Sequence, residues 1–246
     1  MARSIPILLI KNKKLVKTKR YRSPVYIGSP KNAARLFTEI QAEELIFLGI
    51  DDNASQRYLR TSFLESLAYE AQMPLAYGGG ISSLDDARSV FNSGFEKIVI
   101  NQAVFHKPDL IHKIANIYGS QAVVVSIDYR IIRGKRMVFS RHGSTPAGKS
   151  LETIALEAVR YGAGELLITN IDFEGMWCGY DIDAVRSLSD LCTVPLIVNG
   201  GCRGRNDIRA VNEINDTSAG FGSVAVFYKK NQGILLNLPS PDKSSI

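Results

Sequence analysis

The sequence has few of the residues that build cross-links and no segment suited to a membrane. Its three cysteines, Cys178, Cys192 and Cys202, cannot all pair, and their spacing does not match a structural metal site. No uninterrupted apolar run approaches the ~18 residues that cross a bilayer. The first residues also lack the apolar stretch and the cleavage site of a signal peptide. We therefore expect a reduced, cytoplasmic protein with no membrane span, no metal and no cofactor.

A strong excess of charge is also missing. The 30 Lys and Arg residues against 24 Asp and Glu give a net charge of +6, which is too mild to indicate nucleic-acid binding. Acidic residues are absent from one basic segment, between Lys11 and Arg22. Its seven basic residues are Lys11, Lys13, Lys14, Lys17, Lys19, Arg20 and Arg22. This segment is either a solvated loop or a mobile clamp over a phosphate-bearing substrate.

Short aliphatic runs alternate with amphipathic helical patterns along the chain. The predicted strands are Ile5–Ile10, Glu44–Gly49, Pro74–Tyr77, Lys97–Asn101, Ala122–Ile127, Glu165–Asn170, Pro195–Asn199 and Ala219–Ser223. The predicted helices include Asn32–Ile40, Leu59–Ala71, Leu84–Asn92, Asp109–Tyr118, Leu151–Tyr161, Ile182–Leu191 and Asn206–Ile214. Continuously apolar strands are typical of a parallel sheet buried on both faces. The alternation predicts an α/β fold, a single (β/α)₈ TIM barrel over residues 1–246.

An internal repeat supports a barrel made of two similar halves. Residues 44–51 resemble residues 165–172, and residues 74–80 resemble residues 195–201, both at an offset of 121 residues. Neither half could cover its own strand edges, so closure into one barrel is expected. The half-barrels would span approximately 1–120 and 121–238. Residues 239–246 look like a loose tail, and residues 231–239 are too short for a full closing helix.

The carboxyl ends of barrel strands are where active sites form, and three features lie there. Gly78-Gly79-Gly80 and Gly200-Gly201 follow the third and seventh strands, where backbone N–H groups could approach one phosphate on each side of the mouth. The alternative is a pair of tight strand-to-helix turns. Asp128 ends the fifth strand, where it could act as a general acid or base, or could order its own loop.

Four charged residues lie at the opposite end of the barrel, where strands begin. They are Arg3, Glu44, Lys97 and Glu165. They would surround the bottom opening. From the residues alone, an ordinary surface ion-pair cluster of little energetic weight is the simpler interpretation.

Together these motifs resemble the HisF family, the cyclase subunit of imidazole glycerol phosphate synthase, from Arg3 to about Phe227. The closest motif matches are Gly78-Gly-Gly-Ile81, Gly119-Ser-Gln-Ala-Val-Val-Val125 with Ile127-Asp128, Gly162-Ala-Gly-Glu165 and Gly179-Tyr-Asp181. The resemblance implies that a HisH-like glutaminase docks at the bottom as a heterodimer. Its ammonia would pass the gate of Arg3, Glu44, Lys97 and Glu165 and meet a phosphorylated substrate at the top.

The resemblance also implies roles for residues at the mouth. Asp128 and Lys17 match positions that serve catalysis. The positions matched to substrate or phosphate binding are Gly79, Gly80, Asn101, Gly175, Gly200, Gly201 and Ser223.

The departures from the family pattern are concentrated at the same end. Leu9 stands where the family has a second catalytic aspartate, and losing one of two acid–base groups commonly costs on the order of 10²–10⁴ in rate. Gly49 and Gln102 also differ from the residues of the family pattern. The loop with Glu174, Met176 and Trp177 differs from it too. The chain is more similar to a HisF-like branch found with surface-polysaccharide genes. In that branch the barrel, a glutaminase and a sugar amidotransferase convert an acetamido sugar to an acetamidino sugar.

Three functions therefore remain open. The first is ammonia delivery for sugar amidation. The second is the ordinary cyclase reaction of histidine biosynthesis, with Asp128 acting alone or with a substitute such as Asp51. The third is a non-catalytic conduit that activates the glutaminase.

Overall fold

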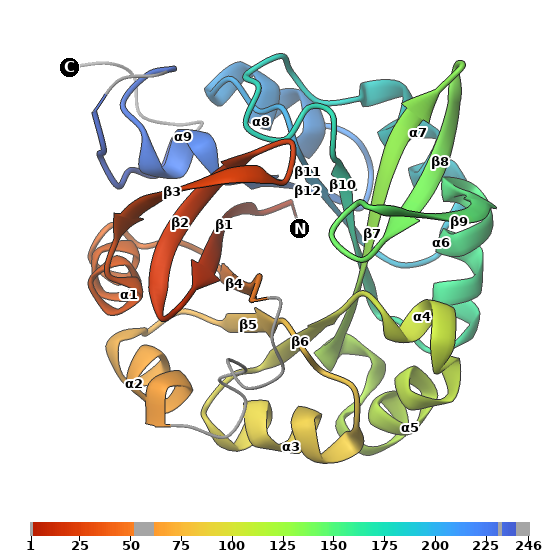
Figure 1. Ribbon diagram of the computed structural model, residues 1–246, viewed down its shortest axis with the longest axis horizontal. Coiled ribbons are helices and arrows are strands. Elements are labelled where there is room, and N and C mark those ends of the chain that lie inside the picture. The colour runs from red at the N-terminus through yellow and green to blue at the C-terminus, as the bar shows by residue number, and fades with distance from the viewer. Residues whose placement is uncertain (1, 52–61, 231–232, 240–246) are drawn as a thin grey trace.

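Eight parallel strands form a closed barrel in the computed structural model, which describes residues 2–51, 62–230 and 233–239 (Figure 1). The barrel strands are β1 (Ser4–Lys11), β4 (Leu45–Gly49), β5 (Leu75–Gly78), β6 (Lys97–Ile100), β7 (Val123–Ile132), β10 (Glu165–Asn170), β11 (Leu196–Asn199) and β12 (Thr217–Phe221). Each pairs in parallel with its neighbour, and the pairings of β10 with β7 and of β12 with β1 close the ring. The predicted (β/α)₈ barrel is confirmed.

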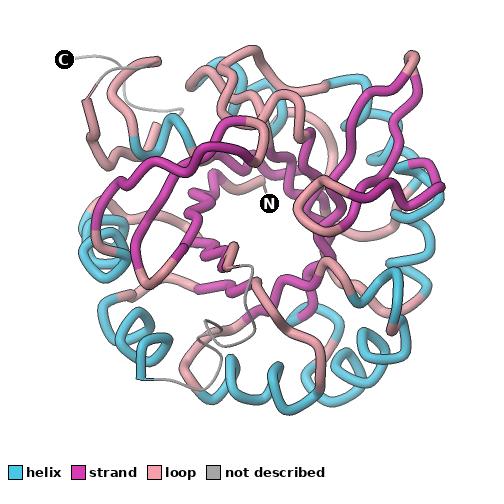
Figure 2. The backbone as a smooth tube through the Cα atoms, in the orientation of Figure 1, coloured by secondary structure: helices cyan, strands magenta, loops and turns pink. Residues whose placement is uncertain are grey.

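Helices surround the strands on the outside, as the tube view shows (Figure 2). They are α1 (Pro30–Glu39), α2 (Ser62–Glu70), α3 (Leu84–Asn92), α4 (Ala103–His106), α5 (Pro108–Tyr118), α6 (Leu151–Arg160), α7 (Ile182–Leu191), α8 (Arg205–Asn212) and α9 (Ser223–Val226), with a 3₁₀ turn at Ser120–Ala122. In α6 the buried residues Leu151, Ile154, Ala155 and Ala158 follow the spacing of one helix face. The helix begins where the Ser150 hydroxyl accepts a hydrogen bond from the Thr153 N–H. The predicted start of α2, at residues 59–61, lies outside the described residues.

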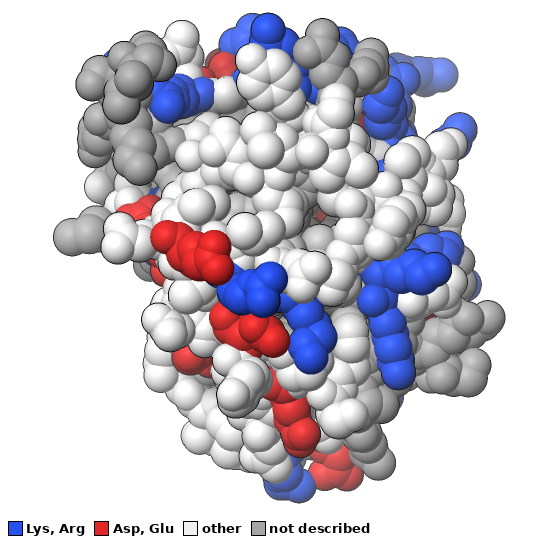
Figure 3. Space-filling view, turned by 90° about the vertical axis from the view of Figure 1, so that its left-hand side faces the viewer, with Lys and Arg blue, Asp and Glu red and all other residues white. Residues whose placement is uncertain are grey.

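Two antiparallel hairpins extend the barrel above its mouth. One consists of β2 (Lys14–Lys19) and β3 (Arg22–Gly28) and continues β1; the other consists of β8 (Lys135–Ser140) and β9 (Thr145–Ser150) and continues β7. The basic segment from Lys11 to Arg22 is therefore a β-ladder and not a solvated loop, while its role as a mobile clamp over a phosphate-bearing substrate stays a prediction. In Figure 3, Lys and Arg side chains predominate along the right-hand edge, which is the mouth side.

The segment after α9 crosses the outside of the barrel without helix in its described part. Phe227 pairs with Ile234 in an isolated bridge, and Leu236 and Leu238 pack against the outer core. The predicted loose tail begins at Pro239, but Pro239 is buried. The rest of that tail lies outside the described residues.

The barrel interior is layered because successive residues of a strand point to opposite faces. On β6 and its end, the inward series is Lys97, Val99 and Asn101. The middle layer is a separate apolar cluster of Ile5, Ile7, Ile46, Ala76, Val99, Val124, Leu167 and Ile197. At about 3.3 Å per residue, the four steps from Lys97 to Asn101 span about 13 Å. The barrel thus has a charged floor, an aliphatic middle and a polar mouth.

Candidate active site

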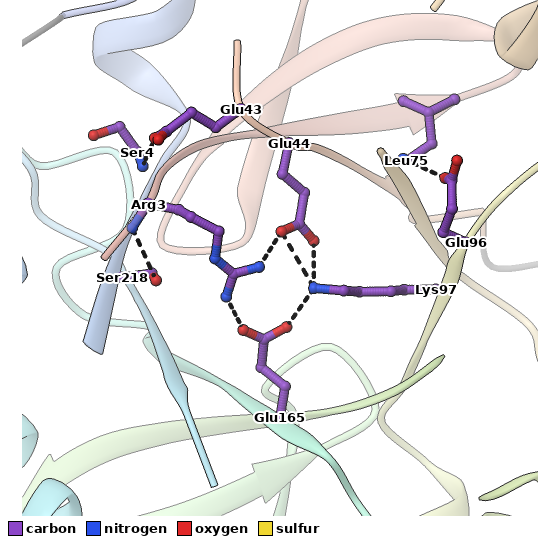
Figure 4. A network of polar contacts seen from close by, with 9 residues as sticks. All are labelled: Arg3, Ser4, Glu43, Glu44, Leu75, Glu96, Lys97, Glu165 and Ser218. Atoms are coloured by element: carbon purple, nitrogen blue, oxygen red, sulfur yellow. Dashed lines mark hydrogen bonds and ion pairs between the residues drawn. The ribbon is translucent and has the colours of Figure 1, made fainter. Parts of the chain in front are cut away.

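The four predicted floor residues meet in one closed ring (Figure 4). Lys97 Nζ donates to Glu44 Oε1 at 3.0 Å and to Glu165 Oε2 at 2.9 Å. The Arg3 guanidinium bridges the same two carboxylates from the other side. Two cations therefore alternate with two anions, and their formal charges cancel.

Burial distinguishes this ring from an ordinary surface cluster. The carboxylate side chains of Glu44 and Glu165 are only 3% and 5% exposed, whereas those of Arg3 and Lys97 are 23% and 19% exposed. A buried carboxylate left without a cation is strongly unfavourable. Each cation is therefore needed to keep the ring closed.

Two outer carboxylates hold the strand ends beside the ring. Glu43 accepts a hydrogen bond from the Ser4 N–H at 2.9 Å, and Glu96 accepts one from the Leu75 N–H at 2.7 Å (Figure 4). These N–H groups lie at the starts of β1 and β5, where the ladder leaves donors without strand partners. The position of the floor is thus fixed by side chains as well as by the sheet.

At the mouth, Asp128 is held by two donors. Tyr21 Oη donates to Oδ1 at 2.8 Å, and Asn101 Nδ2 donates to Oδ2 at 3.1 Å. Gln102 Nε2 donates to Asn101 Oδ1 at 3.0 Å, which orients the Asn101 amide toward the carboxylate. Burial raises the pKa of Asp128 to about 6, although the hydrogen bonds from Tyr21 and Asn101 oppose this shift. A carboxyl group with such a pKa can exchange a proton near neutral pH.

Leu9 occupies the inward position on β1 at the same level. It pairs with Leu48 of the neighbouring strand and is partly exposed to the mouth. The mouth therefore has an apolar side chain, and no carboxyl group, at the position where the resemblance predicted that an acid is missing. Asp51, the suggested substitute, accepts a hydrogen bond from the Asn12 N–H at 2.9 Å and so holds the turn that begins the hairpin.

Lys17 points from the hairpin into the mouth and forms a buried ion pair with Glu174. Glu174 also accepts hydrogen bonds from Thr18 Oγ1 at 3.1 Å and from the Tyr21 N–H at 3.2 Å. Its backbone oxygen accepts one from the Arg20 N–H at 2.9 Å. Burial lowers the pKa of Lys17 to about 7, while the adjoining carboxylate favours the charged ammonium. Glu174 therefore fastens the hairpin over the mouth.

A polar pocket forms beside Lys17 at the ends of β10, β11 and β12. It is lined by Lys17, Glu174, Gly175, Trp177, Asn199, Gly200, Gly201, Cys202, Phe221, Gly222 and Ser223. Five of the predicted residues thus come together. A Cβ added at Gly222 would lie 3.1 Å from Lys17 Cε, so the lysine chain approaches the Gly222–Ser223 turn. The pocket therefore combines an ammonium group with a glycine turn, the elements expected of a phosphate site.

Glycine at this pocket also serves packing. Gly201 has φ +104°, and a Cβ there would lie 1.9 Å from the Gly179 oxygen. Gly201 therefore forms the tight turn of the alternative interpretation, and it also lines the polar pocket.

The other predicted phosphate turn does not belong to the polar pocket. Gly79 and Gly80 have φ +129° and +74° and precede α3, but they do not line the polar pocket. Asn101 is likewise absent from it and instead holds Asp128. Phosphate binding in this half of the barrel remains a prediction.

Two important mouth residues were not assigned by sequence reasoning. Tyr21 gave no signal, because its contact with Asp128 depends on a hairpin that was not predicted. Glu174 was noticed only as an unusual loop residue, and its pairing with Lys17 depends on two segments 157 positions apart.

Comparison with known proteins shows the family of the chain. The family model described as "Histidine biosynthesis protein" matches residues 3–232. A relative from Leptospira borgpetersenii, provisionally named imidazole glycerol phosphate synthase subunit HisF, is 34% identical over 248 residues, covering 99% of this chain and 98% of its own. The chain belongs to the HisF family.

Other HisF proteins are similar over nearly the full length. One from Pseudomonas aeruginosa, provisionally named subunit hisF2, is 36% identical and covers 99% of this chain and 98% of its own. The imidazole glycerol phosphate synthase subunit HisF of Lactococcus lactis subsp. lactis is 34% identical, with coverage of 97% and 95%. By family, the chain is thus a HisF-type synthase subunit. Among its described residues, no helix is long and apolar enough to cross a membrane, and no cluster of His, Cys, Asp and Glu could hold a metal ion.

Proposed function

We propose that this HisF receives ammonia from a HisH-like glutaminase at its floor and delivers it to a phosphorylated substrate at its mouth. The product is an amidated sugar of a surface polysaccharide, made together with a sugar amidotransferase. The observation that carries this proposal is the layered interior, in which a charged floor, an aliphatic middle and the mouth around Asp128 follow one another along the same strands.

The layers favour passage of neutral ammonia. Lys97 is the more flexible of the two ring cations, and its displacement from Glu44 and Glu165 would open the floor. Beyond it, a cation would leave water for an apolar layer at high cost, whereas neutral NH₃ avoids that cost. The interior thus favours NH₃ over ammonium.

The mouth favours amidation over the two alternatives. Leu9 offers no proton and no hydrogen bond where the cyclase pattern has an acid. A bare conduit would need neither Asp128, with its pKa raised to about 6, nor the pocket beside Lys17. When ammonia adds to the acetamido carbon, its nitrogen loses a proton, which the Asp128 carboxylate would accept, and the oxygen that the nitrogen replaces leaves as water. Lys17 and the turns at Gly200–Gly201 and Gly222–Ser223 would hold the phosphate.

A gene-deletion experiment tests the proposal. Deletion should remove the amidino group from the surface polysaccharide, seen as a mass shift of the sugar, without causing a requirement for histidine. The wild-type gene on a plasmid should restore the group. An unchanged polysaccharide in the deletion strain, or a strain that needs histidine, would contradict the proposal.

Two variants in the same strain test the path. Lys97→Ala removes the cation that closes the floor, so ammonia should leak to solvent before it reaches the mouth and the amidated fraction should fall at least several-fold. Lys149→Ala, which breaks an exposed ion pair with Glu157, should not lower it. Ala76→Leu enlarges a small member of the aliphatic layer and should also lower amidation without changing any charge. Thermal melts of the purified variants would separate this effect from unfolding. Full amidation by folded Lys97→Ala and Ala76→Leu proteins would refute passage through the barrel.

A further inference from the structure

A second hollow adjoins the polar pocket on the outer side of the mouth. Its volume is about 430 Å³, within the range of roughly 300–1,000 Å³ typical of small-molecule sites. It is lined by Lys17, Thr18, Lys19, Ser23, Val25, Gly175, Trp177, Ser223, Phe227, Gly233 and Ile234. Four of these are sizeable apolar residues, contributed by β3, by the loop after β10 and by the segment after α9.

The two pockets share a wall. Lys17, Gly175, Trp177 and Ser223 line both of them. Asp128, the proposed proton acceptor, does not line the second pocket. Asp128 does not line the polar pocket either, but it contacts Tyr21, whose N–H donates to the Glu174 carboxylate in the lining of that pocket. A phosphate beside Lys17 would therefore border the apolar hollow and also the Glu174–Tyr21 contact that leads to Asp128.

The walls of the second pocket show two features of a binding site. Val25 and Ile234, which are 58% and 52% exposed, line the same hollow and give it an apolar wall that is open to a ligand. Trp177 has φ +56°, in the left-handed region that a bulky residue rarely adopts, and such strain clusters at ligand sites. An indole ring packs well against the apolar face of a sugar or another ring.

The charge of the polar pocket limits which phosphate fits. Its charged lining residues are Lys17 and Glu174, which are paired with each other. This pair is net neutral, and Lys19 in the wall of the second pocket adds one positive charge, which balances the single negative charge of a doubly substituted phosphate but not the double charge of a terminal phosphate.

We propose that the two pockets hold a phosphate substituted on both sides, with a ring that has an apolar face in the second pocket. This inference rests on the phosphate site of the proposed function and deepens it. The reacting part of the substrate extends from the phosphate toward Asp128, and the second substituent occupies the hollow between Val25, Trp177 and Ile234. The substrate is thus a phosphodiester-type compound rather than a terminal phosphate monoester.

The chain's single tryptophan, Trp177, makes the proposal directly measurable. Inorganic phosphate, phenyl phosphate and diphenyl phosphate are titrated while the fluorescence of Trp177 is recorded, with calorimetry as a second readout. Phenyl phosphate should bind at least tenfold more tightly than inorganic phosphate, and diphenyl phosphate at least as tightly as phenyl phosphate. Equal affinity for phenyl phosphate and inorganic phosphate would overturn the proposal, and so would rejection of the diester.

Substitutions in the exposed apolar wall of the second pocket test whether the phenyl ring binds there. Val25→Ser and Ile234→Ser should each reduce the advantage of phenyl phosphate at least threefold while leaving the affinity for inorganic phosphate unchanged. Ile132→Ser, at an exposed apolar site on β7, is the matched control and should change neither. An undiminished advantage in both wall variants would place the ring elsewhere. Failure of every probe, including inorganic phosphate, would instead count against the phosphate site of the proposed function.

Discussion

Asp128→Asn should make the protein more stable at neutral pH. The folded state raises the pKa of this carboxyl from 3.8 to about 6, chiefly by burial. Ionising it therefore costs the folded state a free energy of about 3 kcal/mol at most, at about 1.4 kcal/mol for each pKa unit. Asparagine has almost the same shape and carries no charge, so we expect a gain of about 1–3 kcal/mol in the free energy of unfolding.

The gain in stability of Asp128→Asn should depend on pH. Below pH 4 the carboxyl group is protonated in both states and the substitution should gain little. Between pH 4 and 6 the unfolded chain ionises while the folded one resists, so the gain should grow, and above pH 6 it should level off. Urea unfolding at pH 4, 5, 6 and 8 measures this profile. Asp172→Asn, at a partly exposed ion pair with Arg130, is the control and should not stabilise. A gain that is the same at pH 4 and pH 8, or a loss at pH 8, would refute the raised pKa of Asp128 in the folded state.

Two more predictions concern the contacts that hold the mouth. Tyr21→Phe removes a hydrogen bond that favours the ionised form of Asp128, so the pKa of Asp128 should rise above about 6. NMR titration of the labelled carboxyl group would measure this pKa. An unchanged or lowered pKa would contradict the contact between Tyr21 and Asp128. Glu174→Ala removes the acceptor for Thr18 and Tyr21, so native trypsin cleavage within the hairpin should become at least threefold faster, whereas Glu157→Ala should leave it unchanged. Equal cleavage in both variants would show that Glu174 does not fasten the hairpin.

The barrel was predictable because its strands are continuously apolar and its helices have one buried face. Seven of the eight barrel strands begin and end within two residues of their predicted bounds, and the fifth, predicted to end at Ile127, continues to Ile132 because it leads into a hairpin. The charged ring was also predictable as a group, since Arg3, Glu44, Lys97 and Glu165 share a place at the starts of strands. The depth of its burial was not, because exposure depends on how the strands close around it.

The hairpin over the mouth was missed for a local reason. Its turns place Asn12, Lys13, Arg20 and Tyr21 at positive φ, the pattern of a two-residue hairpin turn usually signalled by glycine or asparagine. Only Asn12 gives that signal here, and the many lysines obscure the alternation of the strands. The contacts of Tyr21 with Asp128 and of Lys17 with Glu174 depend on this hairpin and could not be predicted without it.

The proposed function requires that the chain retains an ammonia path but has a mouth that no longer cyclises. The most direct measurement is ammonium-dependent turnover of the aminoimidazole-carboxamide ribulotide bisphosphate by the purified chain, beside Leu9→Asp and an ordinary HisF. The account predicts turnover on the order of 100-fold or more below the ordinary HisF, with an increase in Leu9→Asp. Turnover by the unaltered chain close to that of the ordinary HisF would contradict it.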